Sequence, residues 1–180
     1  VKNVEKGSKL FDFIKIKIRE ALIEYQKYLD TIGIYNVIVA DYTQYSHAYR
    51  ILKYEKGSKI HQHLDHSYAT YLTLTFNLNN NYEGGKFSFF DKKYQPELGE
   101  GDLMIFPADI FWSHEVSEIL KGERYSFNCF LRPIPEEVHK VIISELHKGQ
   151  YQKYIDLIRN NKNPDGLLGP YFPERINPLK

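Results

Sequence analysis

Near the start of the chain, hydrophobic residues recur at spacings of three and four. The positions that set this period are Phe11, Ile14, Ile18, Leu22, Tyr25 and Leu29. The period predicts an amphipathic helix over residues 8–30, whose apolar stripe needs a partner layer. Ser8 or Asp12 can cap its start, and Gly33 lies just beyond its end. We therefore expect a support helix that packs on a sheet.

After Tyr35 the pattern changes to short runs that are typical of β-strands. The expected strands are residues 36–40, 48–54, 59–66, 68–79, 86–90, 102–106, 110–116 and 124–131, with a polar loop over 41–47. The run over 68–79 is the clearest, because apolar residues alternate there with hydroxyl and amide residues. Its apolar face should pack on helices, and its polar face, with Thr75 and Asn77, should line a pocket.

Two prolines, Pro133 and Pro135, end the predicted sheet. Pro135 suits the first position of a helix, and Gly149 suits the C-terminal stop of that helix. We expect a second helical piece over 151–159. Residues 160–180 are rich in Asn, Pro and Gly and predict an irregular tail on the domain surface.

The order of these elements predicts the fold class. About eight short strands between helices at the two ends indicate a mainly β fold with flanking helices. We expect a double-stranded β-helix, the jelly roll of the cupin class, with an N-terminal support helix and C-terminal helices. The 180 residues are most simply one domain, residues 1–180. Its jelly-roll core covers about 36–132, and the C-terminal helices and tail cover 135–180.

The amino-acid composition limits the kinds of partner and compartment that we expect. The 24 Lys and Arg against 23 Asp and Glu leave a net charge of +1, so we expect no nucleic-acid or anionic-membrane partner. Cys129 is the only cysteine, which excludes an internal disulfide and fits a reducing, intracellular compartment. The sequence has no apolar run near the roughly 18–20 residues of a membrane span. It does not predict an oligomeric state.

The pair His63 and Asp65 is the strongest candidate for chemistry. Residues two apart on a strand point to the same face, so an imidazole and a carboxylate can chelate one ion there. A divalent iron site of the oxygenase type needs one more imidazole and open positions, and His114 is the candidate. Taken alone, the pair also fits a hydrogen-bonded surface turn.

Further residues, in a defined order along the chain, favour the metal-ligand interpretation of His63 and Asp65. In chain order they are Tyr54, His63-x-Asp65, Leu78-Asn79, Tyr82-Glu83-Gly84-Gly85, Gly101-Asp102, Phe106-Pro107, His114-Glu115-Val116 and Gly122-x-Arg124-Tyr125-Ser126. This set, from Tyr49 to Arg132, resembles the Fe(II)- and 2-oxoglutarate-dependent oxygenases, specifically the prolyl 4-hydroxylase-like branch.

The resemblance implies a role for each motif residue. His63, Asp65 and His114 would be the catalytic iron ligands. Arg124 would pair with the far carboxylate of 2-oxoglutarate, because its planar fork suits a carboxylate. Tyr54 and Ser126 would bind the same carboxylate. Face parity suggests Asn77 or Thr75 as the remainder of this pocket.

The resemblance also implies the reaction. Fe(II), 2-oxoglutarate as cosubstrate and O2 would hydroxylate a C–H bond with release of succinate and CO2, with ascorbate as an accessory reductant. The expected substrate is a prolyl residue in a peptide or protein. Arg124 favours the oxygen-sensing kind of prolyl hydroxylase, since collagen-type enzymes have Lys there.

Other assignments stay open. Hydroxylation of a free amino acid or another small molecule would use the same iron site. A non-catalytic jelly-roll module that binds a metal or a carbohydrate would not need Arg124 opposite the metal. Nucleic-acid demethylases with the same ligands have two arginines six apart, whereas Arg124 and Arg132 are eight apart. A zinc hydrolase would need a different ligand set.

Of three further residues near the motif, His61 and Trp112 keep two interpretations. His61 shares parity with His63 and either lines the mouth or is solvated. His66 has the opposite parity and is expected to be structural. Trp112 shares parity with His114 and either walls the pocket or packs in the core.

Overall fold

The N-terminal helix, α1 (Lys9–Thr31), begins where the sequence predicts. The Ser8 hydroxyl accepts a 3.2 Å hydrogen bond from the Phe11 backbone N–H and so caps the first turn. Gly33 follows the helix with φ +81°, a left-handed conformation that favours glycine. Ile14, Ile18 and Leu29 are buried, and Phe11 and Leu22 pack against the same core, which confirms the predicted apolar stripe except at Tyr25, which is 45% exposed.

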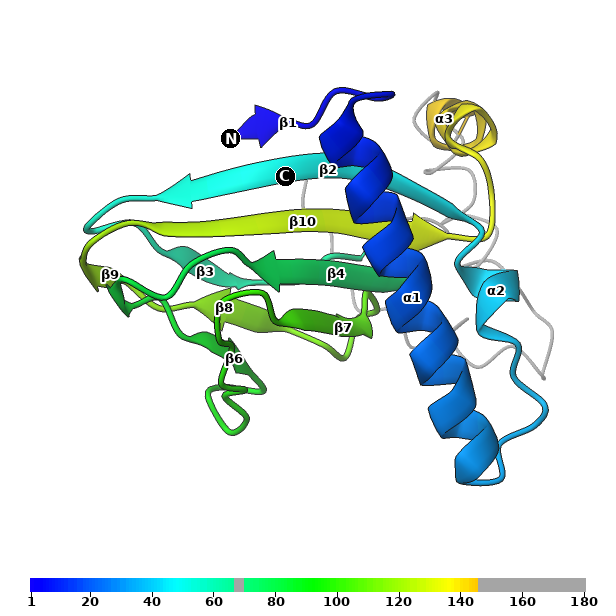
Figure 1. Ribbon diagram of the computed structural model, residues 1–180, viewed down its shortest axis with the longest axis horizontal. Helices are drawn as coiled ribbons and strands as arrows, with labels where there is room; N and C mark the ends of the chain where they lie inside the picture. Colours follow the sequence, from blue (N-terminus) through cyan, green and yellow to red (C-terminus); the bar gives the residue numbers. More distant parts are fainter. Residues whose placement is uncertain (67–69, 146–180) are drawn as a thin grey trace, which may run out of the picture. The chain divides into compact units, whose positions relative to one another are not determined.

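Two antiparallel sheets follow the helix in the computed structural model, which describes residues 1–66 and 70–145 (Figure 1). The larger sheet has the order β1 (Lys2–Asn3), β2 (Tyr45–Tyr54), β10 (Arg124–Arg132), β4 (Leu72–Asn77) and β7 (Leu103–Pro107). The smaller sheet has the order β3 (Ile60–His63), β8 (His114–Val116) and β6 (Phe87–Phe89). A separate pair joins β5 (Glu83–Gly84) to β9 (Ile119–Lys121).

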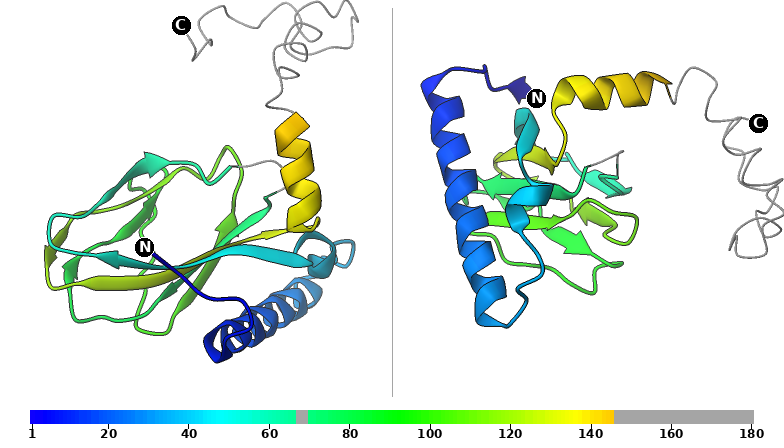
Figure 2. Two further views of the ribbon diagram at one scale, coloured as in Figure 1. Left: turned by 90° about the horizontal axis from the view of Figure 1, so that it is seen from above. Right: turned by 90° about the vertical axis from the view of Figure 1, so that its right-hand side faces the viewer.

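The outer face of the larger sheet carries one hydrophobic core. Leu74 of β4 and Phe127, Cys129 and Leu131 of β10 pack with Ile14 and Ile18 of α1. In the left view of Figure 2, α1 lies on one side of β2 and β10, and the smaller sheet lies on the other. The helix therefore covers the apolar face of the larger sheet, as predicted.

The inner face of the larger sheet looks toward the smaller sheet. A second core of Phe87, Phe89, Phe106 and Val116 fills part of the space between them. Thr73, Thr75 and Asn77 alternate with the core residues of β4 and are also buried, so the polar face predicted from the sequence lies inside. Two facing antiparallel sheets with this helix form the expected double-stranded β-helix.

Four details of the prediction are wrong, and one of them is the strand expected over 110–116, which begins only at His114. Residues 36–40 contain no strand, because the four-residue helix α2 (Val39–Tyr42) occupies this segment. Its Val39 N–H donates to the Gln26 side chain of α1, which holds this turn against the first helix. The predicted loop over 41–47 is shorter, since β2 already begins at Tyr45. The strand expected over 59–66 ends at His63.

A second compact unit begins at Glu137, and the first unit is Val1–Glu136. Helix α3 (Glu136–Glu145) starts just after Pro135, as expected for a proline-initiated helix. The predicted stop at Gly149, the helical piece over 151–159 and the tail over 160–180 lie outside the described residues. No helix among the described residues is long and apolar enough to cross a membrane.

Candidate functional site

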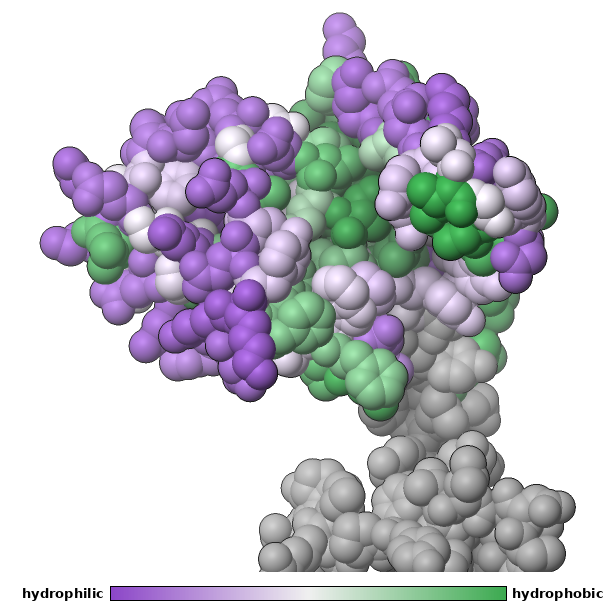
Figure 3. Space-filling model, turned by 90° about the horizontal axis from the view of Figure 1, so that it is seen from below, coloured by the Kyte–Doolittle hydropathy of each residue, from purple (hydrophilic) through white to green (hydrophobic). Residues whose placement is uncertain are grey.

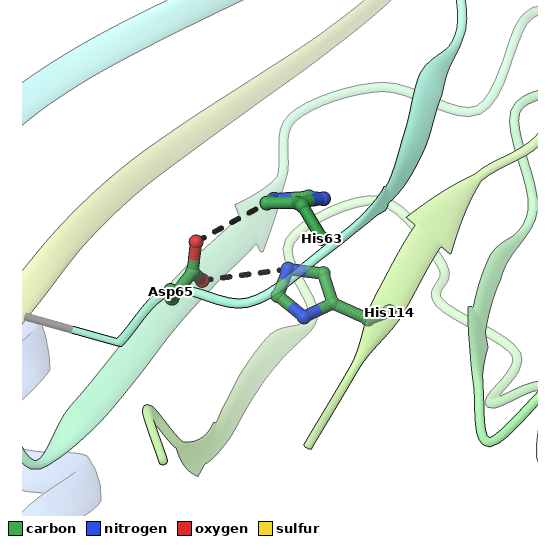
Figure 4. A group of neighbouring side chains, drawn as sticks. All are labelled: His63, Asp65 and His114. Carbon is green, nitrogen blue, oxygen red and sulfur yellow. Dashed lines mark ion pairs between the residues drawn. The ribbon is translucent and has the colours of Figure 1, made fainter. Parts of the chain in front are cut away.

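His63, Asp65 and His114 come together at one point between the two sheets. One ligand atom of each residue lies within 4.8 Å of the others. The His63 Nε2 atom is 3.5 Å from Asp65 Oδ1, and the His114 Nε2 atom is 3.4 Å from Asp65 Oδ2 (Figure 4). Two imidazoles and one carboxylate with converging atoms form the donor set of a facial iron triad, so these residues fit a divalent iron ion.

The smaller sheet positions the two histidines. His63 is the last residue of β3, His114 is the first residue of β8, and the two are direct partners in the antiparallel register. Their rings are 4.3 Å apart between centroids. Asp65 lies beyond the end of β3, so strand parity does not place it. Instead, the Thr73 hydroxyl of β4 donates a 2.8 Å hydrogen bond to Asp65 Oδ2.

Backbone carbonyl groups orient both imidazoles in the same way. His63 Nδ1 is 2.8 Å from the His61 carbonyl oxygen, and His114 Nδ1 is 3.0 Å from the Trp112 carbonyl oxygen. A carbonyl oxygen only accepts, so Nδ1 of each ring carries a proton, and in the neutral ring the lone pair that a metal would take is on Nε2. This arrangement fixes the tautomer that a metal needs from each ring.

The pKa values of the triad move in different directions. The hydrogen bond to Asp65 raises the pKa of His63, whose side chain is 38% exposed. Burial lowers the pKa of His114, whose side chain is only 4% exposed. Burial alone would raise the pKa of Asp65, but the hydrogen bonds from His63 and Thr73 outweigh it and lower that pKa. Asp65 is therefore ionised and His114 neutral at neutral pH, as metal ligands must be.

Aromatic rings enclose the His114 side of the triad. The Phe87 ring stacks on the His114 ring at 5.1 Å with an interplanar angle of 14°, and the Phe106 ring meets it edge-on at 4.8 Å. The Trp112 ring packs on Phe89 and Phe90, which favours the core interpretation of this residue. One side of the triad is thus closed to water, while His63 remains accessible.

Arg124 lies on the inner face of β10 and is only 2% exposed. Among the described residues it has no carboxylate within 4.0 Å, and its buried Nε atom has no hydrogen-bond partner. Its guanidinium carbon is 5.1 Å from the ring centre of Tyr54, its direct partner in the register of β2 and β10. A buried guanidinium with this little compensation fits a bound carboxylate.

A cavity of about 290 Å³ gives access to Arg124. Its lining includes Tyr82, Gly85, Lys86, Phe87 and Leu98. Phe87 also stacks on His114, so the same ring borders both the triad and the cavity that contains Arg124. The arrangement fits a ligand with one end at the metal and the other at the arginine.

The remaining predicted pocket residues are buried beside Arg124. The Ser126 and Thr75 hydroxyls both lie 3.1 Å from the Asn128 Oδ1 atom, to which they donate. The Asn77 amide donates to the Leu98 carbonyl oxygen, and its Oδ1 atom accepts from the Tyr82 hydroxyl. Ser126 and Asn77 thus already have partners in the protein.

Sequence analysis missed the role of Thr73 as a hydrogen-bond donor to Asp65. Its parity with Thr75 and Asn77 placed it on the polar face, but no pattern links a threonine to an aspartate outside the strand. The two other histidines of the segment, His61 and His66, are exposed and do not belong to the triad.

Comparisons with known proteins indicate which family part of the chain is similar to. Residues 49–132 match the family model described as the 2OG-Fe(II) oxygenase superfamily. No curated protein matches the chain. Three of the solved structures to which it is similar are a bacterial, a viral and an animal protein.

A 2OG-Fe(II) family oxidoreductase from Burkholderia pseudomallei is 20% identical over 47% of this chain and 42% of its own, with a TM-score of 0.42. A viral collagen prolyl hydroxylase from Paramecium bursaria Chlorella virus-1 is 17% identical over 73% of this chain and 77% of its own, with a TM-score of 0.48. A Trichoplax adhaerens prolyl hydroxylase, bound to a hypoxia-inducible-factor peptide, is 19% identical over 67% of this chain and 59% of its own, with a TM-score of 0.49. The chain thus spans less than two thirds of the bacterial and the animal protein.

The match covers Tyr54, His63, Asp65, His114 and Arg124, and the cofactors of the family are Fe(II), 2-oxoglutarate and O2. The donor set of the triad fits the iron ion, and the buried Arg124, whose Nε atom has no hydrogen-bond partner in the described part of the chain, fits the carboxylate cosubstrate. Residues 49–132 of the chain, just under half of its length, therefore match the 2OG-Fe(II) oxygenase superfamily.

Proposed function

We propose that the chain is an Fe(II)- and 2-oxoglutarate-dependent dioxygenase that hydroxylates a C–H bond of a prolyl residue. In the overall reaction, one atom of O2 enters the substrate as a hydroxyl group, and the other enters succinate as CO2 leaves 2-oxoglutarate. The state of Arg124 carries the proposal, because a buried cation without an anionic partner is costly unless a ligand supplies the anion.

Separate residues would bind the iron and the cosubstrate. The Nε2 atoms of His63 and His114 and the carboxylate of Asp65 would hold the iron, which leaves positions open for the cosubstrate and O2. Arg124 would bind the far carboxylate of 2-oxoglutarate, with the Tyr54 ring against the guanidinium.

The surroundings would protect the reaction. Phe87 and Phe106 would exclude water from the His114 side of the metal. No protein nucleophile or general base is required, because the bound iron and cosubstrate supply the oxidising chemistry.

The prolyl part of the proposal rests on the motif resemblance. Arg124 stands where collagen-type prolyl hydroxylases have Lys, and Tyr54 precedes His63 at the spacing of the prolyl hydroxylase-like branch. The iron site itself is shared by many substrates, so it supports the chemistry more strongly than the substrate.

The test begins with metal-free protein under anaerobic conditions. Addition of Fe(II) and then 2-oxoglutarate should produce the visible metal-to-ligand charge-transfer band of the cosubstrate complex. The band should be lost in His114→Ala and should need far more 2-oxoglutarate in Arg124→Gln. Lys53→Gln, an exposed cation on the opposite face of β2, is the matched control and should leave the band unchanged. Absence of the band in the wild-type protein would reject the dioxygenase and favour a jelly-roll binding module.

The substrate requires a second step. Succinate formation in air is measured with proline-containing peptides and with free amino acids, and the product is analysed for a gain of one oxygen atom. Stimulation by peptides supports the prolyl proposal. Stimulation by free amino acids alone would replace it with a small-molecule hydroxylase.

A further inference from the structure

A second arginine, Arg50, lies on the same inner face as Arg124. Side chains of a strand alternate between faces, so Arg50, Leu52 and Tyr54 of β2 share one face. Tyr54 is paired with Arg124 and Arg50 is paired with Asn128 in the register of β2 and β10. Arg50 therefore looks into the interior of the jelly roll, four residues along β2 from Tyr54.

The register places Arg50 toward the triad end of this interior. Its guanidinium carbon is 5.3 Å from the Phe130 ring centre, and Phe130 is paired with Thr73 on the other side of β10. Thr73 in turn donates to Asp65 of the triad. The side chain of Arg50 thus leans along the sheet toward the level of the metal ligands, on the far side of Phe130.

Arg50 and Arg124 are separate binding groups. Arg50 lies on β2 and Arg124 lies on β10, opposite Tyr54. Arg50 is four residues from Tyr54, which is about 13 Å along the strand direction. A five-carbon cosubstrate that is held between Arg124 and the metal would not occupy Arg50. Arg50 would then be available to bind a second anionic group. The two arginines therefore divide the interior into a cosubstrate end and a second end beside Phe130.

The guanidinium of Arg50 has no anionic partner among the residues that the structure describes. Its Nε atom is buried without a hydrogen bond, and no described carboxylate lies within 4.0 Å of the side chain. The neighbouring Asn128 Oδ1 atom already accepts from Thr75 and Ser126. Arg50 as a whole is partly buried, and the Phe130 ring supplies a cation–π contact that offsets only part of the cost of burying Nε without a partner.

We propose that Arg50 binds a carboxylate of the substrate and thereby selects acidic substrates. The planar guanidinium matches a carboxylate with two parallel hydrogen bonds, while Phe130 fixes its plane. The carboxylate is the free α-carboxylate of a terminal prolyl unit or the side chain of an acidic residue next to an internal proline. This inference rests on the proposed function, since it concerns the substrate of the same site.

Two pairs of probes test the inference. N-Acetylproline and N-acetylprolinamide differ only in a terminal carboxylate. The blocked tripeptides Ala-Pro-Glu amide and Ala-Pro-Gln amide differ only in a side-chain carboxylate. Binding to the anaerobic Fe(II)–2-oxoglutarate protein is measured by calorimetry, and succinate formation is measured after admission of air.

In the wild-type protein, the acid of at least one pair should bind about tenfold or more tightly than its amide, as expected for a charged hydrogen-bond pair. In Arg50→Gln this preference should fall to about twofold or less. Arg50→Lys should keep a reduced preference, since it retains the charge without the fork. Lys53→Gln, on the outer face of the same strand, should keep the full preference.

The outcomes separate the two proposals. Loss of the charge-transfer band in the wild-type protein rejects the dioxygenase itself. A normal band with equal binding of acid and amide in both pairs, or with no binding of any probe, overturns only the role of Arg50. A preference that survives in Arg50→Gln also overturns it. The wild-type comparison of acid and amide stands even if a variant fails to fold.

Discussion

The Thr73 hydroxyl donates a 2.8 Å hydrogen bond to Asp65 Oδ2, the same carboxylate oxygen that lies 3.4 Å from His114 Nε2. The two histidines come from the smaller sheet, whereas Thr73 comes from the central part of the larger sheet. The carboxylate is therefore held from both sheets, although it lies outside any strand. Thr73 fixes the direction in which Asp65 presents its oxygen atoms to a metal.

Replacement of Thr73 by valine should weaken iron binding. Loss of a hydrogen bond that orients a metal ligand typically costs about 10–100-fold in metal affinity. Thr75→Val is the matched control, because Thr75 has the same orientation on β4 but donates to Asn128. Anaerobic Fe(II) titration measures both, and circular dichroism checks the fold. Equal affinities in the two variants would show that Thr73 does not orient the carboxylate.

The sequence predicted the triad but for a partly wrong reason. Parity along a strand would bring His63 and Asp65 to one face, yet β3 ends at His63. The residues still meet, because the chain turns after His63 and Thr73 holds the carboxylate. The H-x-D spacing thus identifies two of the residues that converge, while the cause of their geometry lies in a hydrogen bond from a distant strand. Such a contact depends on the register of two sheets, which a single sequence does not encode locally.

Arg124→Met should stabilise the metal-free protein and abolish the response to 2-oxoglutarate. Arg124 is 2% exposed and has no described anionic partner, so its removal relieves an uncompensated charge, while methionine retains most of the packing volume. We expect a gain of roughly 1–3 kcal/mol in the free energy of unfolding without ligand. In the wild-type protein with Fe(II), 2-oxoglutarate at about 100 times Kd should add about 2.7 kcal/mol. This increment should vanish in the variant.

Urea unfolding with and without 2-oxoglutarate measures both effects. Lys53→Met serves as a control, since Lys53 is exposed and pairs with Glu55 and Glu123. It should keep the full increment from 2-oxoglutarate. A destabilised Arg124→Met protein would indicate that the cation contributes to the fold rather than to the ligand.

Acidification should weaken iron binding through His63. The hydrogen bond to Asp65 raises the pKa of His63 above the ordinary value of 6.5. In the metal-free protein, protonated His63 therefore contributes stability that is fully present below pH 6.5 and is lost as the pH rises through the raised pKa. A metal requires the neutral ring, so metal binding must release this proton. The pKa of His114 is lowered, so that ring is already neutral in this range.

The expected result is a one-proton dependence. The logarithm of the Fe(II) affinity should be flat well above the pKa of His63 and should then fall by about one unit per pH unit below it. Anaerobic titration from pH 8.5 to pH 5.5 measures the slope. The lowered pKa of Asp65 keeps its contribution outside this range, because that contribution is lost only at lower pH. A flat profile throughout would contradict the assignment of His63 as a ligand.

The sequence predicts helix α1 and the alternating strands correctly because helix caps and hydrophobic periodicity are local features. Ser8 and Gly33 mark the ends of α1, and the leucines of β4 mark its buried face. Helix α2 could not be predicted, since the β-branched residues Val37, Ile38 and Val39 favour a strand. The hydrogen bond from the Val39 N–H to Gln26 overrides that preference. A bulge at Ala48, with φ +56°, shifts the register of β2 and β10, so the directions of the β2 side chains before Ala48 follow only from the structure.

Gly85→Ala should impair both the fold and cosubstrate binding. A Cβ atom at Gly85 would lie 2.5 Å from Ile119 Cδ1 and 3.1 Å from Arg124 Cδ, and its φ is +62°. Gly57 is the matched control: its φ is +85°, but nothing lies within 4 Å of an added Cβ atom. Gly57→Ala should therefore show only the backbone strain, about 1–2 kcal/mol. Gly85→Ala should add about 1–3 kcal/mol from overpacking.

The decisive difference is in ligand binding. Because the new methyl group of Gly85→Ala presses on the Arg124 side chain, it should shift the guanidinium and weaken 2-oxoglutarate binding, whereas Gly57→Ala should leave the affinity unchanged. Urea unfolding and the charge-transfer titration measure the two effects separately. If the variants lose stability equally and bind 2-oxoglutarate equally, then Ile119 and Arg124 yield to the methyl group, and glycine at position 85 is required only for its backbone conformation.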